Sequence, residues 1–309
     1  MWRGWSTKRI QRRSKQGMLG EASVAPPKGG PVSGVHIVTD SSSDLTPEDI
    51  EGRNVTVVPL TIRFGQEEFT DRANLSVDDF YKRMAAADDL PQTACPSPGA
   101  FGQAFRHAEE AGADSVVCLS ISGDLSNTLQ SAQTAADAST GGIPIHVVDS
   151  RSVSSGLGTM VLDAASNAGA SVEPVLQRVA DLVSRTQVFA TLNTLDNLRK
   201  GGRIGGAKAM LGSILAIKPI IDITGGVVEE AGKARTRKRA LQFLYERMLG
   251  AGAIEQVAVM HGGAPDIDDF LELIAARFPR SSLRIGELGA VIGTHGGSAI
   301  IGVSWVGPA

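Results

Sequence analysis

The fold is decided at Val35-His36-Ile37-Val38-Thr39-Asp40-Ser41-Ser42-Ser43-Asp44-Leu45, where a short apolar run meets a cluster of hydroxyl and carboxyl groups. The apolar residues predict a strand, and the polar ones are typical of a loop that precedes a helix. Further β-rich runs occur at Val55–Leu60, Ser115–Leu119 and Ile143–Val148, mostly separated by helical segments such as Ser76–Ala86 and Gly99–Ala111. This alternation predicts a parallel sheet that helices cover on both faces.

Three loops that follow predicted strands are rich in hydroxyl groups, namely Thr39–Asp44, Ser120–Ser131 and Asp149–Ser155. Ligands of open parallel sheets meet the loops at the carboxyl ends of the strands. Ser, Thr and Asp are also good N-caps, and capping alone is the simpler explanation for any single one of them. Three such loops at one sheet edge still predict a place with many hydrogen-bonding groups.

The second half of the chain predicts a different architecture. Its pattern indicates strands at 187–192, 219–223, 227–230, 257–260, 282–288 and 299–306, and helices at 207–217 and 267–278, with a further helix beginning within 233–239. We therefore expect an α/β protein of two domains. A parallel-sheet domain would span residues 34–175 and an α+β domain residues 176–309, after a disordered basic tail and linker at 1–33.

Charge and composition exclude several classes of function. Residues 1–31 hold seven bases and one acid, a formal charge of +6, so the remainder carries −3 − 6 = −9. An acidic body argues against nucleic-acid binding by the folded part. The absence of an 18-residue apolar run predicts no membrane span. Two isolated cysteines, Cys95 and Cys118, are typical of a reducing cytoplasm.

The usual catalytic motifs are missing. There is no G-x-G-x-x-G, G-x-S-x-G or H-E-x-x-H, and Gly201–Gly206 departs from a phosphate-binding loop because Ala207 precedes Lys208. The five histidines lack metal-ligand spacing, so we expect neither a metal nor a cofactor. His295 stands apart, since glycines flank it in a predicted turn between two strands. It is either a satisfied turn histidine or a hydrogen-bond donor to an anion.

Six motifs in order along residues 35–306 resemble the DegV family. They are Thr39–Leu45 (family pattern T-D-S-x-x-D-L), Thr93–Gly99 (T-S-Q-P-S), Leu125–Ala132 (L-S-G-T-Y-Q-S-A), Val148–Ser150 with Ser154–Gly158, Gly201–Ile204 with Ile217–Ile220 (G-G-R-I and I-K-P-I), and Gly293–Gly297 (G-x-H-x-G). Ala94 replaces the usual Ser, Asn127 replaces Gly, and Gly297-Ser298 replaces the commoner Pro-Gly. These departures affect the expected head-group contacts.

The resemblance implies a non-enzymatic protein that binds one long-chain fatty acid and presents it to a separate ATP-dependent kinase, which forms the acyl phosphate. It implies that Thr93, Ser126 and His295 contact the carboxylate. We add the neighbouring Asn127, Thr128 and Gly296 to the expected site. The expected partners are the fatty acid and the kinase, with transient membrane contact and without nucleic acid.

Three further expectations carry open alternatives. Met210, Leu211, Ile214 and Leu215 share a helix face that suits a cavity wall or ordinary core packing. Arg203, Arg235, Arg237 and Lys238 suit a basic docking surface for the kinase or a plain solvated surface. A phosphotransferase or hydrolase that uses Asp40, Ser126 and His295 is the enzymatic alternative.

Overall fold

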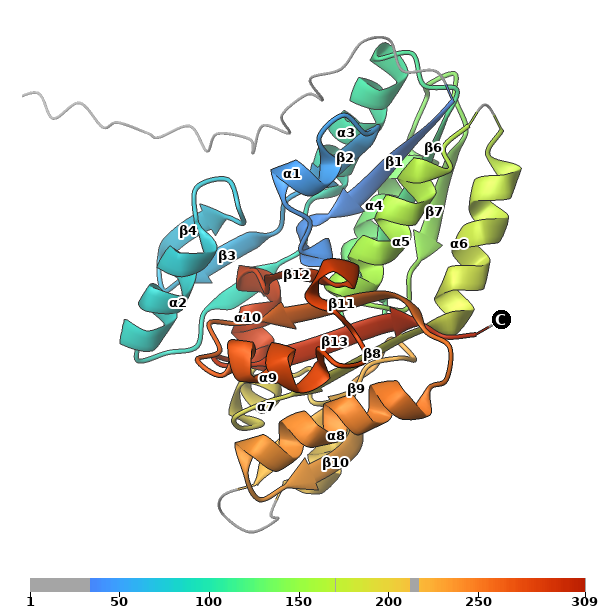
Figure 1. The fold of residues 1–309 in the computed structure, drawn as a ribbon. Helices are drawn as coiled ribbons and strands as arrows, with labels where there is room; N and C mark the ends of the chain where they lie inside the picture. Colours follow the sequence, from blue (N-terminus) through green and yellow to red (C-terminus); the bar gives the residue numbers. More distant parts are fainter. Residues whose placement is uncertain (1–33, 170, 212–216, 309) are drawn as a thin grey trace, which may run out of the picture.

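The computed structural model describes residues 34–169, 171–211 and 217–308. The predicted tail, residues 1–33, lies outside the described residues. Strands of the described part form two larger sheets and a small third one (Figure 1). No helix among the described residues has both the length and the apolar character that a membrane crossing requires.

The first sheet confirms the predicted parallel architecture. Its four strands run in the order β2-β1-β6-β7, with every neighbouring pair parallel. They are β1 (Val35–Asp40), β2 (Val55–Val58), β6 (Ser115–Ser120) and β7 (Ile145–Asp149). Alternate strand residues face opposite cores, because successive side chains of a strand point to opposite faces. Val38 packs with α3 (Pro98–Glu110) and α4 (Thr128–Asp137), whereas Ile37 packs with α5 (Ser155–Ser166) and α6 (Glu173–Arg185).

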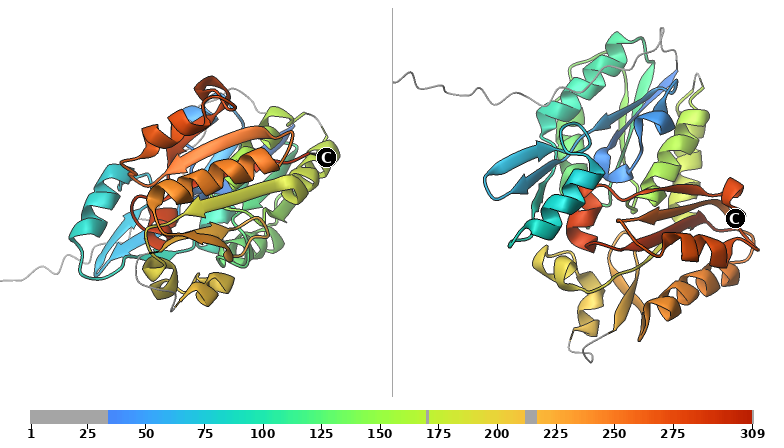
Figure 2. Two further views of the ribbon diagram at one scale, coloured as in Figure 1. Left: turned by 60° about the horizontal axis from the view of Figure 1, so that its bottom comes forward. Right: turned by 60° about the vertical axis from the view of Figure 1, so that its left-hand side comes forward.

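The second sheet is mixed and has the strand order β10-β9-β8-β13-β11-β12. Only its β11–β12 pair is parallel. The strands are β8 (Thr186–Thr191), β9 (Lys218–Asp222), β10 (Glu229–Ala234), β11 (Glu255–His261), β12 (Arg284–Glu287) and β13 (Ile301–Val306). Two helices, α8 (Arg237–Gly250) and α9 (Ile267–Ile274), cover its outer face (Figures 1 and 2). The predicted α+β character of this part is confirmed.

One apolar core joins the two larger sheets. Leu157 and Met160 of α5 belong to the same buried cluster as Ile37 of the first sheet and Val188 and Ile221 of the second. The sheets are therefore held together by shared burial of apolar surface. The predicted boundary between residues 175 and 176 falls inside α6, which packs in this cluster.

A small sheet beside this junction was not predicted. It has the order β4-β3-β5 and consists of β3 (Thr61–Phe64), β4 (Glu67–Thr70) and β5 (Gln92–Ala94). Its core includes Ile62, Phe80 on α2 (Val77–Ala86) and Val291 on α10 (Ala290–Gly296). Both helices lie beside the small sheet (Figure 2). The short helices α1 (Pro47–Ile50), α7 (Asp196–Lys200) and the 3₁₀ segments η1 (Ser41–Ser43), η2 (Gly205–Met210) and η3 (Arg280–Ser282) complete the described elements.

Two local predictions were wrong. Of the α-helix expected at 207–217, residues 207–210 belong instead to the 3₁₀ segment η2, and residues 212–216 lie outside the described residues. The adjacent glycines, Gly205 and Gly206, disfavour an α-helix at this point. His295 lies in the last turn of α10 rather than in a turn between strands. The glycines around it serve close packing, because a Cβ at Gly293 would lie 2.5 Å from Cε1 of the Phe80 ring.

Candidate functional site

A pocket of about 630 Å³, its mouth included, lies where the small sheet meets the two larger ones. Most of the lining is aliphatic and buried, and it comes from both halves of the chain: Leu60, Ile121, Leu125, Val153, Leu198, Ile221, Ile223, Val228, Val291, Ile292 and Ile300. An apolar ligand would therefore be largely removed from water here.

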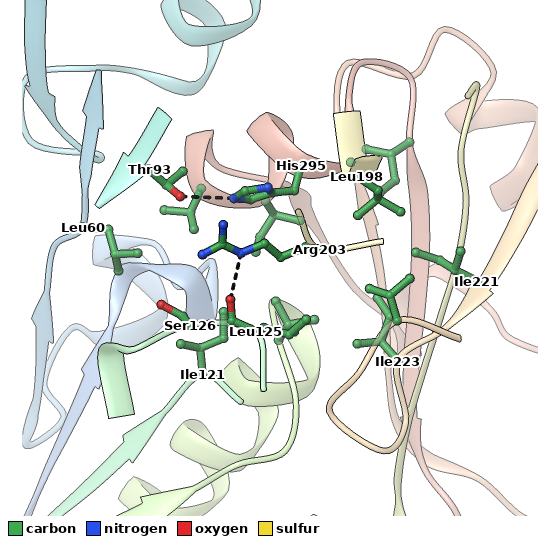
Figure 3. A pocket seen from close by; sticks show the side chains of 16 residues that line it. Leu60, Thr93, Ile121, Leu125, Ser126, Leu198, Arg203, Ile221, Ile223 and His295 are labelled. Atoms are coloured by element: carbon green, nitrogen blue, oxygen red, sulfur yellow. Dashed lines mark hydrogen bonds between the residues drawn. The ribbon is translucent and has the colours of Figure 1, made fainter. Parts of the chain in front are cut away.

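Four polar side chains gather at one end of the pocket, namely Thr93, Ser126, Arg203 and His295 (Figure 3). Thr93 Oγ1 and His295 Nε2 form a hydrogen bond of 3.1 Å across 202 residues of sequence. Ser126 Oγ bonds Thr128 Oγ1 at 2.8 Å. Arg203 is the exposed residue of the lining, so this polar end lies toward solvent.

Each polar side chain comes from a different element. Thr93 lies in the middle of β5, opposite Ile62 of β3. Ser126 belongs to the loop after β6, where its N–H donates to Ser122 O. His295 lies in the last turn of α10, and Arg203 follows α7. The site thus exists only when the small sheet, the first sheet and the second sheet are assembled.

The other residues predicted to contact the ligand, Gly296, Thr128 and Asn127, lie at different distances from the pocket lining. Gly296 lines the pocket next to His295. Thr128 is fully buried and touches the site through Ser126. Asn127 is exposed and its side chain does not cap α4. Asn127 therefore has the weakest structural support of this group.

His295 fits a socket formed by the segment after α7. A Cβ added to Gly201 would lie 2.4 Å from His295 Nδ1, closer than non-bonded atoms approach. Asn197 Nδ2 donates to Thr294 O at 2.9 Å and so ties α7 to α10. The ring therefore sits in space that only glycine at position 201 leaves open, with its Nε2 held at Thr93.

Burial and a nearby cation keep the His295 imidazole neutral. Desolvation, assisted by the positive charge of Arg203, lowers the His295 pKa from 6.5 to about 4. A neutral imidazole carries one N–H. With that proton on Nε2, the ring donates to Thr93 Oγ1, and the Thr93 hydroxyl hydrogen is left for another acceptor. Nδ1 has no hydrogen-bond partner among the described residues.

An acid titration tests this environment of His295. A pKa lowered to about 4 means that the stabilisation from burying the neutral ring is complete above 6.5 and is lost as the pH falls toward 4. We expect the wild-type free energy of unfolding to fall by up to ~3 kcal/mol relative to His295→Gln over that interval, measured by urea denaturation. An unchanged difference between the two proteins at pH 7 and pH 4.5 would contradict the low pKa.

Arg203 lies in the pocket lining, although the sequence placed it on a docking surface. Its Nε donates to Leu125 O at 3.1 Å and its Nη1 to Gly201 O at 2.8 Å. These bonds hold the guanidinium between Ser126 and His295 and leave further N–H groups for a ligand (Figure 3).

The remaining basic residues of the predicted docking surface lie apart from this lining. Arg235 and Lys238 are exposed near the start of α8 and do not line the pocket. Arg237 is paired with Asp266, the Nε–Oδ2 distance being 2.8 Å. The predicted basic group is therefore not gathered at the mouth of the pocket.

The hydroxyl-rich loops that follow the strands of the first sheet lie close together. Many of their polar groups form hydrogen bonds with one another. Asp40 is fully buried, and its carboxylate accepts from Ile121 N–H at 2.9 Å and from the Ser42 and Ser120 hydroxyls. Burial raises the Asp40 pKa despite these bonds. No hydrogen bond joins Asp40 to Ser126 or His295 within the described residues, so the three side chains do not form a catalytic relay there.

The cavity-wall interpretation of the face at Met210 and Leu211 is wrong for these two described residues, whereas the alternative of core packing holds for Met210. Met210 is buried in the shared core and Leu211 is 45% exposed, and neither lines the pocket. Ile214 and Leu215 lie outside the described residues. The wall is formed instead by residues such as Ile221 and Ile223, whose i, i+2 spacing on a predicted strand was the one signal available in the sequence. Among the described residues, no group of three or more His, Cys, Asp or Glu side chains is suited to hold a metal ion.

Comparison with known proteins identifies relatives along nearly the whole folded chain. Residues 34–307 match the family model described as an uncharacterised protein of the DegV family. A DegV domain-containing protein of Deinococcus radiodurans is 38% identical over 284 residues, which cover 87% of this chain and 97% of that protein. A DegV domain-containing protein of Streptomyces coelicolor is 34% identical over 275 residues, with 87% and 97% covered.

Solved structures with the same fold include proteins described as fatty-acid-binding. A DegV family protein from Thermus thermophilus, described by its fatty acid binding, matches with a TM-score of 0.82 and 34% identity over 89% of this chain and 100% of that one. The fatty acid kinase B3 protein of Streptococcus pneumoniae, loaded with linoleic acid, matches with a TM-score of 0.76 and 25% identity over 89% and 100%.

Proposed function

Because this chain belongs to the DegV family, we propose that it binds one long-chain fatty acid in the pocket between its sheets. The observation that carries the proposal is an apolar, mostly buried pocket that ends in Thr93, Ser126, Arg203 and His295. The fatty acids named for the Thermus and Streptococcus relatives support it. Each methylene removed from water contributes about 0.8 kcal/mol, so ~14 of them supply on the order of 11 kcal/mol before ordering costs.

The carboxylate end of the ligand belongs at the polar end of the pocket. A buried carboxylate without partners costs several kcal/mol, so it must accept several hydrogen bonds. We propose that the hydroxyl groups of Thr93 and Ser126 and the imidazole of His295 donate these bonds, the single Nε2–H of His295 turning from Thr93 Oγ1 to the ligand when the site is filled. Gly296, Thr128 and Asn127 would complete the loop and helix end around them. Arg203 adds the positive charge that favours an ionised acid over a neutral ester.

We further propose that this protein presents its fatty acid to a separate ATP-dependent kinase. The polar end carries the exposed Arg203 and therefore lies toward solvent, where a second protein can reach the carboxylate. Arg203 already donates to Leu125 O and Gly201 O, so we propose that the neutral donors Thr93, Ser126 and His295 make the closer contacts with the carboxylate. This suits a carboxylate that must later attack a phosphoryl group, because an oxygen held too tightly in its ground state reacts slowly. The likeness to the fatty acid kinase B3 protein supports this role.

Two unpaired cysteines are in keeping with a cytoplasmic setting.

Lipid extraction and two substitutions test this function. Mass spectrometry of lipid extracted from the purified protein should find a long-chain fatty acid. Thr93→Val and His295→Ala should each weaken binding about 10- to 100-fold, because each removes a hydrogen bond to a charged group worth ~1.5–3 kcal/mol.

Matched variants separate this effect from a general loss of stability. Thr134→Val and His107→Ala remove the same groups from helices α4 and α3, away from the pocket. Titration with a fluorescent fatty acid should show unchanged affinity for both. Wild-type affinity in Thr93→Val and His295→Ala as well would remove these residues from the site.

A further inference from the structure

The pocket has an apolar end opposite its polar end. Ile221 and Ile223 lie on the far side from Thr93 and His295 in Figure 3. Both side chains are nearly inaccessible, at 2% and 9% exposure, and Val228 beside them is 4% exposed. This end is formed by β9 and the segment that leads from β9 into β10, so a chain that entered from the polar end would meet it last.

Two contacts with the first sheet fix the tip of this β9–β10 hairpin. The buried Ser122 hydroxyl donates to Gly226 O at 2.6 Å, and the Arg151 guanidinium donates to Gly225 O. Gly226 has φ +82°, and a Cβ there would lie 2.6 Å from Ser122 Oγ, so the tip approaches the loop as closely as its backbone permits. The far end of the pocket is therefore anchored to the loops that follow β6 and β7.

An anchored wall of branched side chains resists a longer ligand. Packed interiors do not absorb extra methylenes without displaced side chains or backbone. Val153 and Ile121, from the anchoring loops themselves, line the same pocket and are also buried. Once an acyl chain reaches this wall, each additional methylene must bend back or remain in water.

We propose that Ile221 and Ile223 are the stop that sets the longest acyl chain this protein accepts. The inference rests on the proposed function, since it assumes a fatty acid with its carboxylate at Thr93, Ser126 and His295. Affinity rises about fourfold with each methylene until the chain reaches the stop, and then it levels off or falls. The ligand class is thus an unbranched fatty acid whose upper length is decided by β9.

Removal of the stop should lengthen the preferred chain. Ile221→Ala and Ile223→Ala each delete three carbons, which makes room for about two further methylenes and raises affinity for acids beyond the wild-type optimum about tenfold. Ile223→Val deletes one carbon and should shift the optimum by about one methylene, with little risk to folding. The measurement is displacement of a fluorescent fatty acid by saturated acids from 10 to 22 carbons.

Ile220 provides the matched control on the same strand. It is 1% exposed, but it faces α8 in the outer core rather than the pocket. Ile220→Ala should therefore lose a similar amount of stability and keep the wild-type length profile. An unchanged profile in Ile221→Ala, Ile223→Ala and Ile223→Val, with the wild type binding fatty acids normally, would overturn the stop. Failure of the wild type to bind any acid of the series would instead overturn the proposed function.

Discussion

Asp44→Ala should destabilise the protein by about 3–5 kcal/mol, because it removes one partner of a buried ion pair. The Asp44 side chain is 1% exposed and its Oδ1 lies 3.0 Å from Arg72 Nη2. Oδ1 also accepts from Gly289 N–H at 2.8 Å, and Oδ2 accepts from the Ser154 hydroxyl at 2.6 Å. The substitution leaves the Gly289 N–H and the Ser154 hydroxyl without this acceptor, and it removes the negative partner of Arg72, whose Nη2 keeps its bond to Glu287 O.

These contacts join parts that are distant in sequence. Asp44 follows η1 in the loop after β1, Ser154 precedes α5, and Gly289 immediately precedes α10, the helix that carries His295. The loss should therefore loosen the junction on which the pocket depends. We expect the urea midpoint of Asp44→Ala to fall well below that of the wild type.

Two comparisons make the Asp44 result interpretable. Asp44 has φ +53°, a conformation that asparagine tolerates better than alanine, so Asp44→Asn separates the backbone cost from the lost charge and should give an intermediate midpoint. Asp78→Ala removes an ion pair to Lys82 in which both side chains are about 70% exposed, and it should change stability by less than ~0.5 kcal/mol. Equal midpoints for Asp44→Ala and Asp78→Ala would show that the buried network is not important for stability.

Gly201→Ala should weaken fatty-acid binding about tenfold or more while leaving the fold intact. The new Cβ would lie 2.4 Å from His295 Nδ1 and 2.9 Å from Cε1, so the imidazole must rotate away from Thr93. The Gly201 backbone is not in the left-handed region, and alanine is intrinsically favourable at a helix end. The cost therefore falls on the position of one ring, and the lost hydrogen bond to a charged head group is worth ~1.5–3 kcal/mol.

Two measurements on Gly201→Ala test this prediction: its affinity for a fatty acid and the position of the His295 imidazole ring. Titration with a fluorescent fatty acid measures the affinity, and the imidazole proton resonances of His295 report its displacement. Gly250→Ala is the matched control, since a Cβ there has open space and lies at the end of α8. Wild-type affinity together with an unmoved His295 resonance in Gly201→Ala would show that the socket does not position the ring.

Much of the first sheet was predictable because its signals are local. The apolar run Val35–Val38 and the runs 115–119 and 143–148 predict strands from four to six residues each. The same holds for α2 and α3, which begin at the capping residues Ser76 and Ser97. Short-range periodicity and capping act within one or two turns of chain, so they can be recognised without tertiary contacts.

The small sheet and α10 escaped prediction for the opposite reason. The strands of the small sheet are three or four residues long, too short for a clear alternation. The glycine-rich sequence of α10 has a weak helix propensity, and the helix forms where it packs against Phe80 and Tyr81 of α2. Tertiary packing outweighed local preference at both places.

The residues alone predict a parallel-sheet half, an α+β half and the motif side chains at 93, 126 and 295. The contact between Thr93 and His295, the place of Arg203 in the lining, and the far wall at Ile221 and Ile223 emerge only from the folded arrangement of the chain. The physical reason is distance along the chain. A cavity is a space between elements that approach across tens to hundreds of residues, and its walls depend on close packing that no local pattern records.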